Sequence, residues 1–129
     1  MAWKLYSDRP IYAQLVEKIQ QKILSGEYVI GQRLPSTRDL AAEIAVNPNT
    51  LQRAFAELER IGLVYTQRTG GRFIADDPSK IEELRHQRLN QCVAAFLEQI
   101  AALGYSEHDA AALISEAISV TETVVEVEG

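Results

Sequence analysis

The chain has 129 residues, 47% of them hydrophobic and 24% charged, with one cysteine and a formal net charge of −5. It has room for one ordinary domain, or for a small domain with an appendage. No apolar run reaches the ~20 residues of a membrane span, the first residues lack a signal-peptide stretch, and Cys92 alone cannot form an intrachain disulfide. We therefore expect a cytoplasmic protein that does not associate with membranes.

The charge divides unevenly along the chain. Residues 1–76 carry ten Lys/Arg and eight Asp/Glu, a net charge of +2, whereas residues 77–129 carry three and ten, a net charge of −7. The change coincides with Pro78, which also interrupts the hydrophobic pattern. The sequence therefore predicts two parts, residues 1–76 and 77–129, and only the first could favour phosphate groups.

The first predicted helix begins at Pro10, a residue that is well tolerated at the first helical position. Apolar residues recur four apart from Ile11 to Ile23, which is typical of an amphipathic helix facing a core, and Gly26 stops it. The connector 27–35 has the composition of a loop with one short strand.

Two short helices follow, each with a start signal. Residues 36–39 read Ser-Thr-Arg-Asp, a capping box, and the helix behind them places Leu40, Ala41 and Ile44 inward. Asn47 is a predicted N-cap with Pro48 at the first helical position, and Gly62 ends this next helix. Its inward face is Leu51, Ala54, Phe55, Leu58 and Ile61.

The β-prone runs 63–66 and 72–74 enclose Gly70-Gly71, which predicts a hairpin. Beyond Pro78 the pattern indicates a long helix to about residue 103, a second capping box at 106–109 and a last helix. Residues 120–129 fit a frayed helix, an edge strand or disorder equally well. The fold class is thus α+β and mostly helical, an N-terminal winged helix-turn-helix followed by a short C-terminal helical region.

This layout indicates double-stranded DNA as a partner. Helix 48–61 could enter the major groove by its polar N-terminal end, while the tip 67–72 could lie at the minor groove or the backbone. The helix that begins at Ser36 could place Arg38 and its first backbone N–H groups near a phosphate. The candidate DNA-binding residues are Ser36, Thr37, Arg38, Asn47, Asn49, Thr50, Gln52, Arg53, Arg68, Thr69, Gly70 and Arg72.

Each feature taken alone also has a structural explanation. Arg53 could pair with Glu57 four residues on, Arg68 and Arg72 could solubilise a hairpin, and two-helix segments occur in many other proteins. The conjunction of these features in this order favours DNA. The alternative is a winged-helix module that binds protein, which the mild charge of +2 leaves open and which salt dependence would distinguish.

No pattern indicates an enzyme, a metal site or a cofactor. His86 and His108 do not lie in a metal-ligand spacing, and Cys92 falls on an apolar helical face as a small core residue would. No phosphate-binding loop or nucleophile-base arrangement stands out.

Four segments together resemble the DNA-binding domain of GntR-family bacterial transcription regulators. They begin at Pro10, Gly31, Val46 and Gly62 and read PIYAQL, GQRLPSTRDLA, VNPNTLQRAFAELE and GLV. The resemblance covers about residues 9–75, and it places the family's second-helix arginine on Arg38 and its wing on 68–71. Many members have arginines where Pro48 and Gln52 stand here. The Asn-Pro-Asn-Thr start is instead similar to the YtrA-like subgroup, which keeps an arginine at the Arg53 position, and Thr69 departs from the usual wing.

The C-terminal part is too short for the large effector domains of other subgroups. The resemblance implies a homodimer formed through these helices, binding a palindromic operator, with repression as the family's default. Independently, two helices cannot easily enclose a core of their own, so they must pack on the winged domain, on a second chain, or on both. A pocket between them could hold a small apolar effector, for which no individual residue argues. The predicted dimer-interface residues are Leu89, Val93, Phe96, Ile100, Leu103, Leu113 and Ile114.

Overall fold

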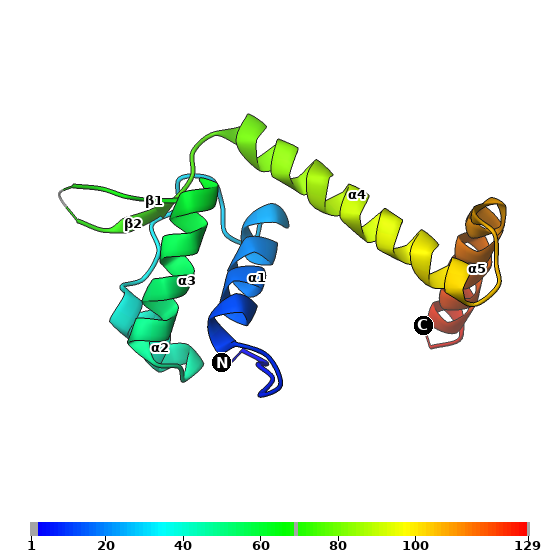
Figure 1. The fold of residues 1–129 in the computed structure, drawn as a ribbon, viewed down its shortest axis with the longest axis horizontal. Coiled ribbons are helices and arrows are strands. Elements are labelled where there is room, and N and C mark those ends of the chain that lie inside the picture. Colours follow the sequence, from blue (N-terminus) through cyan, green and yellow to red (C-terminus); the bar gives the residue numbers. More distant parts are fainter. Residues whose placement is uncertain (1–2, 69, 129) are drawn as a thin grey trace. The chain divides into compact units, whose positions relative to one another are not determined.

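The computed structural model describes residues 3–68 and 70–128, with side chains described as far as Thr121. The chain forms two compact units, residues 1–85 and 86–129. The first holds α1 (Ile11–Leu24), α2 (Thr37–Ile44), α3 (Pro48–Ile61), β1 (Val64–Thr66), β2 (Arg72–Ile74) and the start of α4 (Pro78–Ala102). The second holds the rest of α4, the short helix η1 (Glu107–Asp109) and α5 (Ala110–Glu128). Figure 1 shows α1 and α2 beside α3, with the hairpin at the end of α3.

The predicted start and stop signals set the helix bounds in the first unit. The Ser36 hydroxyl accepts a hydrogen bond from the Asp39 N–H, and the Asn47 side chain accepts one from the Asn49 N–H, so both residues are N-caps. Gly62 ends α3 in the left-handed conformation. Pro10 is the residue before α1 rather than its first helical residue, which shifts that predicted boundary by one position.

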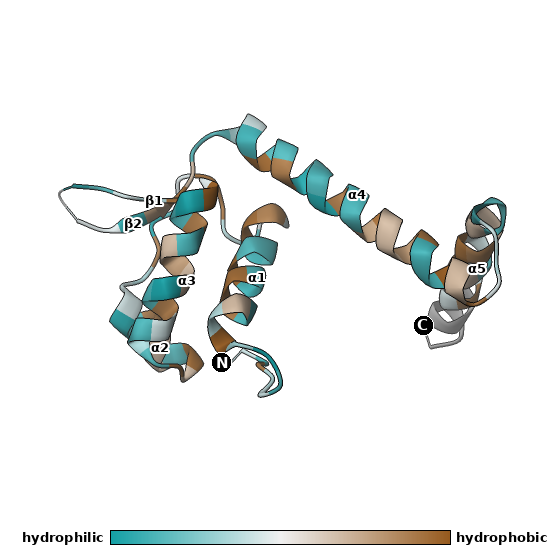
Figure 2. Cartoon of the chain, in the orientation of Figure 1, coloured by the Kyte–Doolittle hydropathy of each residue, from teal (hydrophilic) through white to brown (hydrophobic). Residues whose placement is uncertain are grey.

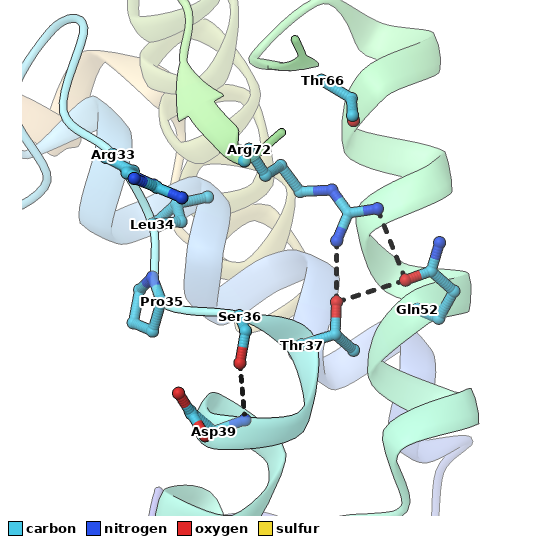
Figure 3. Close-up of a pocket in the computed structure, with 10 residues that line it drawn as sticks. Arg33, Leu34, Pro35, Ser36, Thr37, Asp39, Gln52, Thr66 and Arg72 are labelled. Atoms are coloured by element: carbon cyan, nitrogen blue, oxygen red, sulfur yellow. Dashed lines mark hydrogen bonds between the residues drawn. The ribbon is translucent and has the colours of Figure 1, made fainter. Parts of the chain in front are cut away.

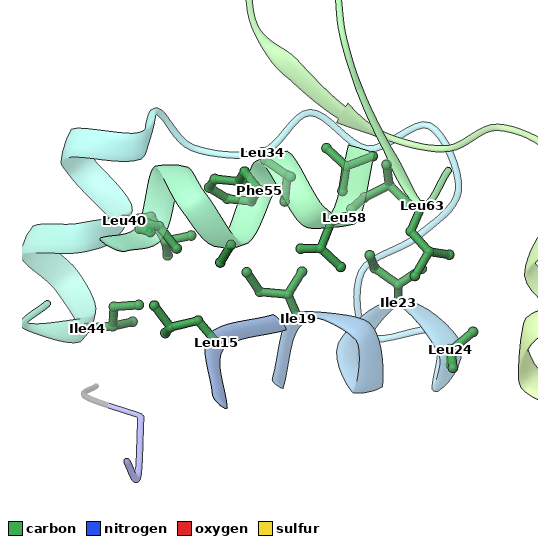
Figure 4. Close-up of a cluster of buried hydrophobic side chains, with 14 of the residues drawn as sticks. Leu15, Ile19, Ile23, Leu24, Leu34, Leu40, Ile44, Phe55, Leu58 and Leu63 are labelled. Atoms are coloured by element: carbon green, nitrogen blue, oxygen red, sulfur yellow. The ribbon is translucent and has the colours of Figure 1, made fainter. Parts of the chain in front are cut away.

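One hydrophobic core lies beneath α3. Leu51, Ala54, Phe55 and Leu58 are fully buried, whereas Ile61 is only half-buried. Figure 4 shows part of this core, with Leu15 and Ile19 of α1 facing α3 and Leu34 of the connector beside Phe55. The α2–α3 turn is tight because Ala45 adopts a left-handed conformation, with φ of 61°. The core therefore holds α3 by one stripe and leaves its opposite side exposed.

The hairpin is antiparallel, with Val64 opposite Ile74 and Thr66 opposite Arg72. Arg33, in the connector before α2, forms an isolated bridge with Phe73, in place of the short strand expected in the connector. The Phe73 and Tyr65 rings stack at 5.6 Å. These contacts fix the base of the hairpin against the segment that leads into α2.

The first two turns of α4 belong to the winged unit. Ile81 is buried in its core, and the Arg85 Nε donates a hydrogen bond to the Leu24 carbonyl at 2.8 Å. The units consequently divide at residue 85, beyond the 76/77 boundary proposed from charge. The Asp77 carboxylate caps α4, accepting hydrogen bonds from Ser79 and Lys80 that hold the pKa of Asp77 below its usual value.

The second unit has no core of its own among the residues whose side chains are described. None of residues 86–121 is buried, although apolar residues recur along this part of α4 and in α5 (Figure 2). The capping box at Ser106 and Asp109 is present as predicted. Residues 120–128, for which the sequence left three conformations open, continue α5 as a helix. Within the described part of the chain, no helix is long and apolar enough to cross a membrane.

Candidate nucleic-acid interface

A concave surface opens between α2, α3 and the hairpin. It encloses about 510 Å³, and its lining includes Ser36 and Thr37 at the start of α2, Gln52 on α3, and Gly71 and Arg72 on the hairpin (Figure 3). Three segments far apart in the sequence thus meet here, all of which the sequence analysis assigned to DNA binding. The opening is lined largely by polar side chains, as expected of a surface that meets a hydrated, charged partner.

Arg72 holds this surface together from within. Its guanidinium donates hydrogen bonds to Thr37 Oγ1 at 2.8 Å, to Glu59 Oε1 at 3.2 Å and to Gln52 Oε1 at 3.3 Å. The same group lies 4.6 Å from the centre of the Phe55 ring, and the side chain is only 15% exposed. Arg72 therefore ties the hairpin to α2 and α3, whereas the sequence suggested only a DNA contact or a solubilising role.

Arg53 lies on the outward side of α3 and stacks on α1. Its guanidinium carbon is 3.7 Å from the centre of the Tyr12 ring. Glu57 pairs instead with Arg60 at 2.5 Å, a contact that lowers the pKa of Glu57, and Arg53 forms no ion pair with any described residue. The structure thus rejects the suggested Arg53–Glu57 pair and leaves the donors of Arg53 available on an exposed, oriented side chain.

Other predicted contact residues sit at the exposed ends of these elements. Arg38, in the first turn of α2, and Arg68, in the hairpin, are exposed and make no hydrogen bond or ion pair with the described part of the chain. Asn49 is exposed and Thr50 half-buried at the start of α3. Gly70 is exposed with a φ of 125°. Thr69 lies outside the described residues.

Arg33 is a residue that the sequence analysis did not select. It lines the concave surface, its guanidinium lies 6.0 Å from the Phe73 ring, and a Cβ built on Gly71 would be 3.0 Å from Arg33 Nε. Gly71 therefore gives this arginine room beside the hairpin. Arg33 lies in a loop of ordinary composition, so the sequence did not indicate a DNA contact there. Its bridge to Phe73 is what brings it to the concave surface.

The predicted dimer residues all lie on the second unit. Leu89, Val93, Leu103 and Ile114 are exposed, while Phe96, Ile100 and Leu113 are half-buried. Five of these seven line a groove of about 320 Å³ between α4 and α5. Leu89 and Val93 lie outside it, nearer the N-terminal end of α4. No cluster of residues suited to hold a metal ion occurs in the described ranges.

Helices packed around a buried stripe, a tight α2–α3 turn and a hairpin after α3 define a winged helix-turn-helix protein. Residues 11–74 match the family described as bacterial regulatory proteins, gntR family. The chain is also 36% identical over 103 residues to the uncharacterized HTH-type transcriptional regulator YhcF of Bacillus subtilis, covering 80% of this chain and 85% of that one. The chain belongs to the GntR family, whose members are transcriptional regulators rather than enzymes.

Two further relatives agree with this assignment and with the YtrA-like resemblance. The HTH-type transcriptional repressor YtrA of B. subtilis is 41% identical over 71 residues, which cover 55% of each chain. The solved structure of a GntR family transcriptional regulator from Listeria monocytogenes superposes with a TM-score of 0.82 at 35% identity, covering 87% of this chain and 98% of that one. The predicted fold class and family are therefore confirmed.

Proposed function

We propose that this chain is a sequence-specific transcriptional repressor that binds a palindromic operator as a homodimer, with α3 in the major groove and the hairpin tip at the minor groove or the backbone. One observation carries the proposal. Four of the arginines among residues 3–85, Arg9, Arg60, Arg72 and Arg85, pair with carboxylates. The four without an ion pair to a described residue are Arg33, Arg38, Arg53 and Arg68.

The four unpaired arginines lie on α2, α3, the hairpin and the connector that bridges to it. Cations that no carboxylate neutralises can bind phosphates and displace the counterions of DNA, which gives most of the affinity. Arginine donors also suit guanine in the major groove and a narrow minor groove. The net charge of only +2 thus does not record that four of the arginines among residues 3–85 have no carboxylate partner in the described part of the chain.

The homodimer rests on the second unit. None of residues 86–121 is buried, and Leu89, Val93 and Leu103 are at least half exposed, so this part of α4 and α5 needs a partner surface. A second copy of the chain supplies the same apolar stripe, as a two-fold dimer requires. Two copies would place two α3 helices on half-sites separated by one turn of DNA, roughly 34 Å, or by a multiple of it. An effector that entered the groove between α4 and α5 would have to be small and apolar.

The proposal also specifies that the chain represses transcription. Repression is supported by the match to YtrA, a protein named as a repressor, over 71 residues of the winged unit. A dimer bound across a promoter would exclude other proteins from the same duplex. Transcription from a promoter that carries the selected site should therefore fall when the protein is added, and a rise would contradict this part alone.

Selection of bound sequences from a random DNA pool tests the central proposal. We expect a palindromic site, sedimentation of the free protein as a dimer, and an affinity that falls steeply with salt. Arg38→Ala should weaken all sequences alike and reduce the salt slope by about 1, while Arg53→Ala should cost about 1–3 kcal/mol and relax one base position. Arg88→Ala, on α4 in the second unit, removes the same charge and should leave the selected site unchanged. Unaltered binding by both of the first two variants would refute the proposed face.

A further inference from the structure

We infer that Gln52 determines sequence specificity by presenting only hydrogen-bond donors, so that the base it reads is guanine. The inference rests on the proposed function and deepens it. A glutamine with a freely rotating amide pairs best with adenine, which offers one acceptor and one donor in the major groove. In this chain the amide of Gln52 is not free, because its oxygen is already occupied within the protein.

Two donors converge on that oxygen, as Figure 3 shows. The Arg72 Nη2 lies 3.3 Å from Gln52 Oε1, and the Thr37 hydroxyl lies 3.2 Å from the same atom. The Thr37 oxygen also accepts from Arg72 Nη1 at 2.8 Å, so its single proton is directed to Gln52. Both acceptor positions of the amide oxygen are thereby used.

The groups around this amide fix its orientation. A guanidinium has five N–H donors and no acceptor, so turning the amide would set the NH₂ group of Gln52 against the N–H groups of Arg72. Arg72 is itself fixed, by Glu59 Oε1 at 3.2 Å and by the Phe55 ring. The Gln52 oxygen is consequently held inward.

The NH₂ group remains for a partner. It makes no hydrogen bond to any residue in the described ranges, and Gln52 is exposed in the second turn of α3, near the end expected to enter the groove. Guanine presents two adjacent acceptors in the major groove, N7 and O6, which suit the two N–H bonds of one amide. Adenine would set its N6 donor against a group that no longer accepts.

The test compares sites selected by the wild-type chain and by Gln52→Ala. We expect one position of each half-site to lose its preference in the variant, and that position to be guanine in the wild-type site. Adenine there should bind about tenfold or more weakly, within the range of a bidentate contact. Replacing the guanine by 7-deazaguanine, which lacks the N7 acceptor, should also weaken wild-type binding and leave Gln52→Ala unaffected. Gln21→Ala, on the exposed side of α1, is the matched control and should select the wild-type site.

Two substitutions at the same position separate donors from acceptors. Gln52→Lys, which only donates, should keep the preference for guanine, whereas Gln52→Glu, which only accepts, should lose it. A Gln52-dependent adenine, or no Gln52-dependent position in a site that the wild-type chain does select, would overturn the inference. Failure of the wild-type chain to enrich any sequence would instead overturn the proposed function beneath it.

Discussion

Replacing Arg72 by alanine should destabilise the winged unit substantially. The change removes three hydrogen bonds, two of them part-buried, together with the contact to Phe55, and leaves the Glu59 carboxylate without its cation. A hydrogen bond to a charged group contributes ~1.5–3 kcal/mol when desolvated. Because the Glu59 side chain is 35% exposed and water can replace part of what is lost, we expect a total of about 2–3 kcal/mol rather than the full sum.

The single tryptophan makes this measurable for the winged unit alone. Trp3 packs against its core, so urea unfolding followed by tryptophan fluorescence reports on residues 1–85. A loss of 2–3 kcal/mol should lower the midpoint by about 1–2 M urea. Arg68→Ala removes the same charge from the same hairpin at an exposed site and should change stability by less than about 0.5 kcal/mol. Equal effects of the two variants would show that the Arg72 contacts contribute nothing to the fold.

Three more outcomes follow from the geometry. Tyr12→Ala should weaken specific DNA binding about two- to fivefold by releasing Arg53, whereas Tyr12→Phe keeps the aromatic face and should keep the affinity. Equal losses of affinity when DNA is titrated with the two variants would argue against the stacking. Ile100→Glu should make the protein sediment as a monomer without altering Trp3-monitored unfolding, and a persistent dimer would place the interface elsewhere. In urea unfolding, Gly62→Ala should lower the free energy of unfolding by about 1 kcal/mol, whereas Ala45→Gly should raise it by about 0.5 kcal/mol because it relieves a positive φ. A more stable Gly62→Ala together with a less stable Ala45→Gly would contradict this explanation.

Local chemistry accounts for what the sequence predicted well. The bounds of α3 were predictable because Asn47, Pro48 and Gly62 each act on their own backbone within a turn or less. The hairpin was predictable for the same reason, since two β-prone runs enclose a glycine pair. These features gave the fold class and the order of its parts.

The features that the sequence did not predict depend on contacts between distant segments. Arg72 meets Glu59 and Thr37 from 13 and 35 positions away, so the sequence showed a charge without its partners. Arg33 reaches the concave surface only through its bridge to Phe73. The boundary proposed from charge preceded residue 85 because composition does not record that Ile81 is buried in the core of the winged unit.

The hydrogen bonds of Gln14 hold the N-terminal segment of the winged unit, and they bear on how short a folded fragment can be. Gln14, 2% exposed, accepts a hydrogen bond from the Tyr6 N–H and donates to the Tyr6 and Arg9 carbonyls, as a neighbouring strand would. The family match runs from residue 11 to residue 74, so it leaves out Tyr6 and Arg9 at one end and Ile81 at the other. A fragment cut at those limits would leave the buried Gln14 amide without its hydrogen-bond partners and would remove Ile81 from the core. We therefore expect the minimal folding unit to extend beyond the segment that sequence similarity delimits, to residues 3–85.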